Sequence, residues 1–145
     1  QTEHLCVAMH RPGAYAFDSA GPPMPGTALR IADDGELLVR RGALTFSGYL
    51  GRPAATADAF TADGQWLRTG DAAEIDAAGC VRIIGRKKEI LALSTGKKLA
   101  PLAIERRLVD DPHVAHAVVV GDGRKHAAAL LFVRAGVDPS TAEVR

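Results

Sequence analysis

A short charged stretch at residues 85–89, GRKKE, interrupts the chain between two apolar segments, VRII and ILAL. Charged side chains in such a stretch usually stay solvated, because burying unpaired charge costs free energy. Domain boundaries also fall in polar, exposed segments, so this stretch is the best candidate for a boundary. A chain of 145 residues is one ordinary domain or two small ones, and the charged stretch favours two.

The composition is that of a folded globular protein, with 47% hydrophobic and 24% charged residues. The chain has 18 basic and 17 acidic residues, so neither nucleic-acid binding through bulk charge nor a basic membrane-binding surface is expected. No apolar run approaches the roughly 20 residues that span a bilayer. The start has no signal-peptide pattern, and Cys6 and Cys80 have no metal-binding spacing, which together favour a cytoplasmic protein with reduced thiols.

The part before the boundary is expected to be rich in short strands. Residues 12–26 have the Gly and Pro content of a loop. Residues 28–41 predict a hairpin with its turn at Asp34-Gly35, because apolar and polar residues alternate around that dipeptide. The Ala-rich segment 52–60 predicts a short helix or turn with Thr56 as its N-cap. Two further strands are expected over residues 63–76 and 77–86.

The part after the boundary combines one helix with strands. Residues 94–101 are expected to form a loop. Residues 101–111 predict a helix, because their apolar side chains recur at helical spacing and Pro101 suits a first turn. Strands are expected over 114–122 and 126–136. The predicted fold class is therefore α+β, with a β-rich first part and a small α+β second part.

Polar residues at loop positions carry the functional signal. No Ser-His-Asp set, Walker glycine loop or dinucleotide fingerprint is found. Instead, four short polar segments follow one another: Thr2-Glu3, Arg68–Asp71, Arg86–Lys88 and Ser94–Lys98. Each segment alone is typical of a turn or a solvated loop. Their order and spacing resemble the adenylate-forming enzymes, the AMP-dependent synthetase/ligase superfamily.

The resemblance covers nearly the whole chain. Gln1-Thr2-Glu3 is similar to the end of the family's aromatic-Gly-x-Thr-Glu motif, and residues 35–53 resemble its Gly-Glu to Gly-Tyr segment. Residues 63–71 contain the Trp-Leu-Arg-Thr-Gly-Asp motif, and 85–101 resemble the interdomain hinge and the loop beyond it. The resemblance implies that residues 1–85 are the C-terminal part of a large nucleotide-binding adenylation domain. Residues 86–145 would be a small mobile C-terminal domain, apparently truncated.

The resemblance also implies an activity, that of an AMP-forming acid–thiol ligase. Such an enzyme uses ATP and Mg²⁺ to turn a carboxylic acid into an acyl-adenylate, and then forms an acyl thioester with coenzyme A. The Ser-Thr-Gly-Lys form of the loop at 94–97 resembles long-chain fatty acyl-CoA synthetases, enzymes of fatty acid metabolism. Two alternatives stay open: an acyl-AMP ligase that loads the phosphopantetheine of an acyl carrier protein, and a non-catalytic interaction fragment with the adenylation fold.

The resemblance assigns nucleotide binding to Thr2, Asp71, Ile83 and Arg86. Asp71 offers two acceptor oxygens to the ribose hydroxyls, and Arg86 offers a planar set of donors to ribose and phosphate oxygens. Glu3 would be a catalytic residue and the Mg²⁺ ligand, because a carboxylate can hold the cation that offsets repulsion between two anions. Ile83 would pack near the nucleotide, or would be an ordinary core residue of a strand.

Two further residues follow from the resemblance. Lys88 stands at the catalytic hinge, where the small domain rotates between the two half-reactions, and a charged, solvated residue suits a hinge. Gly96 keeps the glycine that lines the pantetheine channel, although Thr95 and Lys97 replace a Gly and an acid of the commonest family pattern.

The chain alone is expected to be inactive. By resemblance, the phosphate loop and the acyl pocket belong to an N-terminal portion that precedes Gln1, and the catalytic lysine follows Arg145. The expected partners are therefore the carboxylic acid, coenzyme A or a carrier protein, and that N-terminal portion.

Overall fold

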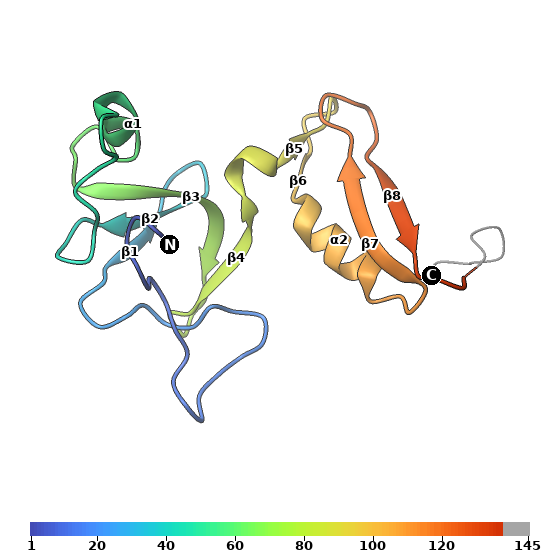
Figure 1. Cartoon of the computed structure of the whole chain (residues 1–145), viewed down its shortest axis with the longest axis horizontal. Helices are drawn as coiled ribbons and strands as arrows, with labels where there is room; N and C mark the ends of the chain where they lie inside the picture. Colours follow the sequence, from blue (N-terminus) through green and yellow to red (C-terminus); the bar gives the residue numbers. More distant parts are fainter. Residues whose placement is uncertain (138–145) are drawn as a thin grey trace. The chain divides into compact units, whose positions relative to one another are not determined.

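The computed structural model describes residues 1–137 of the chain, which fold as a mixed α+β, strand-rich protein (Figure 1). This confirms the predicted fold class. The chain forms two compact units, which divide between Lys87 and Lys88. The division lies inside the charged stretch at 85–89.

The first unit is built on a four-stranded antiparallel sheet in the order β1-β2-β3-β4. Its first hairpin turns at Asp34-Gly35, where the Asp34 carboxylate accepts the N–H of Glu36 at 3.2 Å and Gly35 has a φ of 85°. The two predicted hairpins are thus confirmed. The strands are β1 (Leu29–Ile31), β2 (Glu36–Arg40), β3 (Trp66–Ile75) and β4 (Val81–Arg86).

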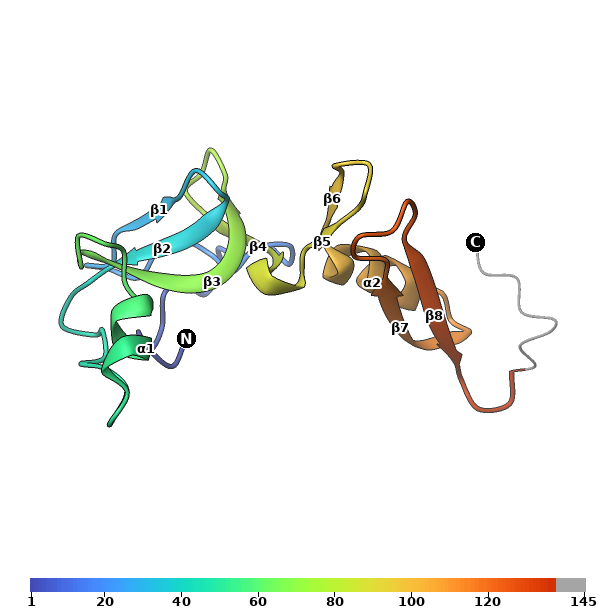
Figure 2. The ribbon, with the colours of Figure 1, turned by 90° about the horizontal axis from the view of Figure 1, so that it is seen from above.

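Strand β3 bends in the middle and serves two neighbours (Figure 2). Its first part pairs with β2, as Leu67 does with Val39, and its second part, from Asp71 to Ile75, pairs with β4; Ala72 pairs with both neighbours, with Glu36 on the β2 side. Gly70 lies at the bend with a φ of 71°, a backbone conformation that favours glycine. The bend puts the residues around Gly70 next to both the start of β2 and the end of β4.

Helix α1 (Pro53–Asp58) is confirmed, but its predicted N-cap is wrong. Pro53 occupies the first turn, where its fixed φ favours helix initiation, and Arg52 is the N-cap residue. Thr56 therefore lies inside the helix. Its hydroxyl donates to the carbonyl of Arg52 and accepts the N–H of Tyr49, both at 2.9 Å.

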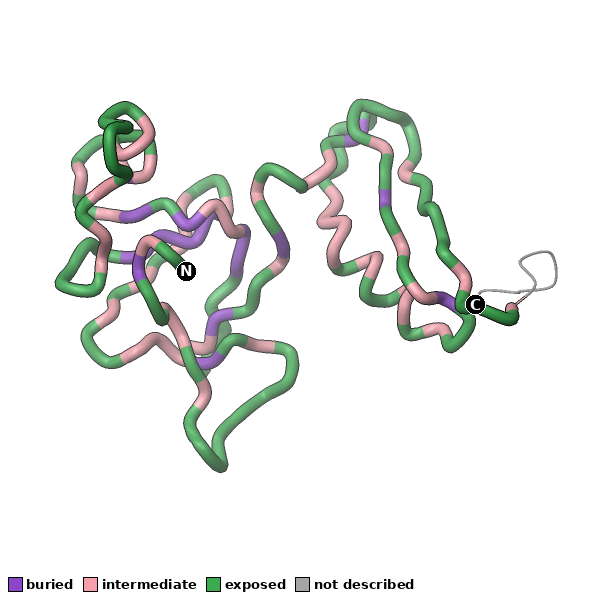
Figure 3. Tube along the Cα trace, in the orientation of Figure 1, coloured by how far each residue is buried: buried purple, intermediate pink, exposed green. Residues whose placement is uncertain are grey.

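Figure 3 shows that buried residues of the first unit lie along its strands, and these residues include two apolar clusters. One contains Leu37, Ala73 and Val81, and the other contains Val39, Phe60 and Leu67. Val7 packs against both clusters, so the core also holds the segment that precedes the sheet. Residues 12–26 contain no helix or strand beyond isolated bridges, as predicted.

The second unit places helix α2 (Pro101–Val109) against β7 (Val114–Val120), which pairs with β8 (Ala128–Val133). The Glu105 carboxylate accepts the N–H of Val119 at 2.8 Å and ties the helix to the strand. The predicted helix and both strands are confirmed. The remaining elements are the 3₁₀ turn η1 (Lys87–Glu89), β5 (Leu91–Ala92) and β6 (Lys98–Leu99).

The second unit differs from the sequence prediction at one segment. The segment 94–101 was expected to be a loop throughout, but Lys98 and Leu99 form β6, because they pair with β5. The end of the segment predicted as a small domain, residues 138–145, lies outside the described residues. No helix within residues 1–137 is long and apolar enough to cross a membrane.

Leu67→Ala tests the core of the first unit. Leu67 is fully buried, so the substitution removes buried methyl groups and leaves a cavity. We expect the free energy of unfolding to fall by about 2–5 kcal/mol, measured by urea denaturation with circular dichroism. Leu50→Ala makes the same chemical change at a side chain that is fully exposed, and should alter stability by less than about 0.5 kcal/mol. Equal losses in the two variants would contradict this core.

Candidate functional site

Asp71 and Arg86 form an ion pair between neighbouring strands. They are paired residues of β3 and β4, and Nη1 of Arg86 lies 3.0 Å from Oδ1 of Asp71. The same nitrogen donates to the carbonyl of Thr69 at 3.3 Å. The Asp71 side chain is 19% exposed and the Arg86 side chain 59% exposed. The pair therefore presents acceptor oxygens and guanidinium donors together at one place on the surface.

The hydroxyl of Thr69, a buried residue, holds the bend of β3 that precedes Asp71. This hydroxyl donates to the carbonyl of Leu37 at 2.8 Å and accepts the N–H of Asp71 at 3.1 Å. Gly70 lies between them, and a Cβ there would approach Nη1 of Arg86 to 3.9 Å. The Asp71 backbone is therefore fixed to β2 by a side chain from its own strand.

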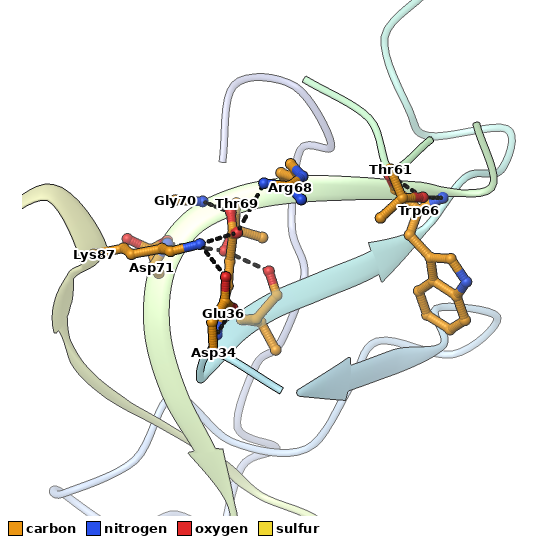
Figure 4. A network of polar contacts seen from close by, with 10 residues as sticks. Asp34, Glu36, Thr61, Trp66, Arg68, Thr69, Gly70, Asp71 and Lys87 are labelled. Atoms are coloured by element: carbon orange, nitrogen blue, oxygen red, sulfur yellow. Dashed lines mark hydrogen bonds and ion pairs between the residues drawn. The ribbon is translucent and has the colours of Figure 1, made fainter. Parts of the chain in front are cut away.

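The side chain of Glu36 also bonds to this bend of β3 and to Lys87 (Figure 4). Its carboxylate is buried, accepts the N–H of Gly70 at 3.0 Å and lies 2.9 Å from Nζ of Lys87. Lys87 also bonds to the exposed carboxylate of Asp34. The hydrogen bonds to Asp34 and then Glu36 raise the pKa of Lys87, so its ammonium stays charged at neutral pH.

A cavity of 570 Å³ opens beside Asp71. It brings together Asp71 and Ile83, two of the predicted nucleotide-binding residues, with Gln1 and Thr69. Gln1 also donates from Nε2 to the carbonyl of Thr69 at 3.4 Å. Ile83 is 37% exposed, so it lines the cavity from the surface and does not belong to the buried core. The lining combines apolar side chains with one carboxylate, which suits a ligand with an apolar face and hydroxyl groups.

Thr2 and Glu3 follow Gln1 but do not line this cavity. Thr2 is exposed. The hydroxyl of Tyr49 donates to Oε1 of Glu3 at 2.7 Å, and the carbonyl of Glu3 accepts the N–H of Phe46 at 2.8 Å. The Tyr49 hydrogen bond lowers the pKa of Glu3 and raises the pKa of Tyr49, because it stabilises the carboxylate. Glu3 is therefore an ionised, oriented carboxylate at neutral pH.

Lys88 and Gly96 belong to the second unit. Lys88 is exposed within η1, the 3₁₀ turn at the division between the units. Gly96 lies in the turn between β5 and β6 with a φ of 84°. A Cβ at Gly96 would meet no atom of the described residues within 4 Å, so the backbone conformation favours glycine there and crowding within the chain does not.

Sequence reasoning missed Glu36, Lys87 and Tyr49. Glu36 was recognised only as part of a Gly-Glu segment, and Lys87 only as one charge of a solvated stretch. The available signal was a carboxylate at the start of a strand whose next three residues are all apolar, because a buried carboxylate requires partners. The partners themselves lie far along the chain and could not be read from the sequence.

Comparison with known proteins defines the class. Residues 88–144 match the family described as AMP-binding enzyme C-terminal domain. The structure of residues 1–137 resembles an anthranilate CoA ligase, AuaEII, solved with anthranoyl-AMP, with a TM-score of 0.80 and 26% identity over 93% of this chain and 28% of that one. O-succinylbenzoate coenzyme A synthetase from Bacillus subtilis, solved with AMP, gives a TM-score of 0.76 and 26% identity over 92% and 30%. The chain belongs to the adenylate-forming enzymes.

Its homologues within this class are long-chain fatty acid–CoA ligases. The chain is 47% identical over 127 residues to the long-chain-fatty-acid–CoA ligase FadD15 of Mycobacterium tuberculosis. The match covers 88% of this chain and 21% of that protein. The chain thus belongs to the acyl-CoA ligase family and spans about a fifth of the length of the curated relatives it matches.

Tyr49→Phe tests the environment of Glu3. The substitution removes the hydrogen bond that contributes most to the lowered pKa, so the pKa of Glu3 should rise toward its ordinary value. Carboxyl ¹³C NMR titration measures this shift. Because the folded-state pKa is depressed, the bond stabilises the fold above the ordinary Glu pKa and loses its effect as pH falls through the folded pKa. Tyr15→Phe, at an exposed ring, should leave Glu3 unchanged; an unchanged titration in Tyr49→Phe would contradict the contact.

Proposed function

We propose that this chain forms part of an ATP-dependent long-chain fatty acid–CoA ligase. Residues 1–85 would be the end of its large adenylation domain, and residues 86–145 its small mobile domain. The observation that carries the proposal is the Asp71–Arg86 pair, whose charged atoms lie 3.0 Å apart, together with the cavity that Asp71 and Ile83 line. The similarity to solved ligases with AMP or an acyl-AMP supports a nucleotide as the ligand.

The proposed reaction has two steps. A carboxylate oxygen of the fatty acid bonds to the α-phosphorus of ATP, and the bond to pyrophosphate breaks. The sulfur of coenzyme A then bonds to the acyl carbon, the bond to AMP breaks, and the thiol proton is released. In both steps Asp71 would accept hydrogen bonds from the ribose hydroxyls, while Arg86 would contact ribose or phosphate oxygens and Ile83 the base.

Glu3 is the proposed ligand for Mg²⁺. Mg²⁺ takes oxygen ligands, and the lowered pKa of Glu3 keeps its carboxylate ionised, so the side chain fits the cation. When bound, Mg²⁺ would neutralise charge on the ATP phosphates. The Tyr49 hydrogen bond would orient the carboxylate, and Thr2 would offer its hydroxyl to a phosphate oxygen.

The second unit would act in the thioester step. Lys88 is the proposed hinge residue, because it is exposed and stands where the two units divide. Gly96 would line the channel for the pantetheine arm. Coenzyme A is favoured over a carrier protein as the acceptor because the curated homologues are named as CoA ligases.

The experiment is a pair of assays on the full-length ligase that contains this chain. ATP–pyrophosphate exchange is measured with a panel of carboxylic acids from C2 to C18, followed by thioester formation with coenzyme A and with a phosphopantetheinylated carrier protein. We expect exchange to require a long-chain acid and coenzyme A to be the better acceptor. Exchange with no acid of the panel would reject the ligase and favour a non-catalytic fragment, while transfer to the carrier protein alone would favour the acyl-AMP ligase.

Asp71→Ala in that enzyme should raise the ATP KM and slow acyl-adenylate formation. The loss of hydrogen bonds to a charged acceptor corresponds to roughly 1.5–3 kcal/mol in kcat/KM for ATP. Asp18→Ala is the control, because it removes an exposed carboxylate whose ion pair with Arg82 lies outside the proposed site. Unchanged ATP kinetics in Asp71→Ala would contradict the assignment.

Lys88→Pro should separate the two half-reactions. The proline ring fixes φ and thereby restricts rotation of the backbone at this residue. We expect adenylate formation to survive better than thioester formation in single-turnover assays of each step. Lys88→Ala removes the side chain but keeps the backbone free, so it should affect both steps less. Equal losses of both steps in Lys88→Pro would count against Lys88 as the hinge.

A further inference from the structure

The buried carboxylate of Glu36 contacts two residues that flank the Asp71–Arg86 pair in the sequence, one beside Asp71 and one beside Arg86. Oε1 of Glu36 accepts the N–H of Gly70, which precedes Asp71, at 3.0 Å. Oε2 of Glu36 lies 2.9 Å from Nζ of Lys87, which follows Arg86. Glu36 lies at the start of β2, so from a third strand it contacts both β3 and the residue that follows β4, as Figure 4 shows.

The burial of the Glu36 carboxylate makes its two bonds energetically important. Its side chain is 5% exposed, so its charge needs partners to offset the cost of leaving water. The nearest partners are the Gly70 amide and the Lys87 ammonium, with Nη1 of Arg68 at a longer distance of 3.6 Å. A displacement of either Gly70 or Lys87 would leave the carboxylate poorly paired, which opposes such movement.

The contact of Lys87 with Asp34 does not have the same consequence. The Asp34 side chain is 51% exposed, and exposed ion pairs contribute little because water and salt screen them. The other hydrogen bond of the Asp34 carboxylate is to the N–H of Glu36, within the β1–β2 turn. Glu36, in contrast, is a buried carboxylate that bonds both to Gly70, before Asp71, and to Lys87, after Arg86.

We propose that Glu36 is a positioning residue for nucleotide binding, which helps to fix the spacing of Asp71 and Arg86 by bonding to Gly70 on β3 and to Lys87, the residue that follows the last residue of β4. The proposal rests on the proposed function of the pair. Lys87 is the ionic partner of Glu36, and the residue after it, Lys88, begins the second unit. The Glu36–Lys87 bond therefore also anchors the last residue of the first unit.

The test uses Glu36→Gln and Lys87→Met in the full-length ligase. Glutamine can still accept the Gly70 N–H but has no charge for Lys87, and methionine keeps most of the lysine stem without the ammonium. We expect each variant to raise the ATP KM in pyrophosphate exchange about tenfold. The KM for palmitate and kcat should stay within about twofold of the wild type, because the pair contacts the nucleotide and not the acid.

Two variants serve as controls. Arg82→Met removes an exposed ion pair with Asp18 from the same strand, β4, and should leave the ATP KM unchanged. Asp34→Asn removes the exposed partner of Lys87 but keeps Glu36, and should also leave it unchanged. The melting temperature of every variant is measured alongside, so that unfolding is recognised.

The outcomes separate this proposal from the proposed function. If the wild-type enzyme shows no acid-dependent exchange, the proposed function fails. If the wild type exchanges but Glu36→Gln and Lys87→Met keep a normal ATP KM, Glu36 is not a positioning residue. If both KM values, kcat and the melting temperature change together, the contact is merely structural and the proposal is overturned. A selective rise in the ATP KM, with Asp34→Asn normal, supports it.

Discussion

The bend of β3 at Gly70 is the constraint on which the first unit depends. A strand that pairs with β2 along one half and β4 along the other must change direction, and a φ of 71° at Gly70 provides that change. The bend also exposes backbone polar groups that regular pairing would satisfy. The Thr69 hydroxyl and the Glu36 carboxylate bond to two of them, the N–H groups of Asp71 and Gly70. The same contacts orient Asp71 toward Arg86, so the geometry of the site follows from the geometry of the sheet.

Much of the local structure could be predicted from the sequence. The hairpins, α2 and its proline start have local signals, namely Gly turns, residue alternation and helical spacing, and the structure confirms them. Thr56 was misassigned as an N-cap because Pro53, three residues earlier, gives the stronger start signal. The Glu36–Lys87 contact joins residues 51 positions apart, and no local pattern encodes such a pairing.

The two units suggest a division of roles in the proposed ligase. The first unit holds the Asp71–Arg86 pair through backbone and side-chain bonds from three strands, which suits a site that must keep one geometry through both steps. The second unit has its own helix-on-strand packing, tied by the bond from Val119 to Glu105. Lys88, where the two units divide, is exposed, which suits a residue whose backbone angles change in the proposed reaction cycle.

The central claim is that Asp71 and Arg86 bind a nucleotide ribose in a geometry set by Glu36. The most direct test is a crystal structure of the proposed full-length ligase, soaked with AMP. The account predicts that the Asp71 carboxylate lies within about 3 Å of the ribose hydroxyls while Glu36 keeps its contacts with Gly70 and Lys87. A ribose bound away from Asp71, or a Glu36 side chain turned from both partners in the complex, would contradict it.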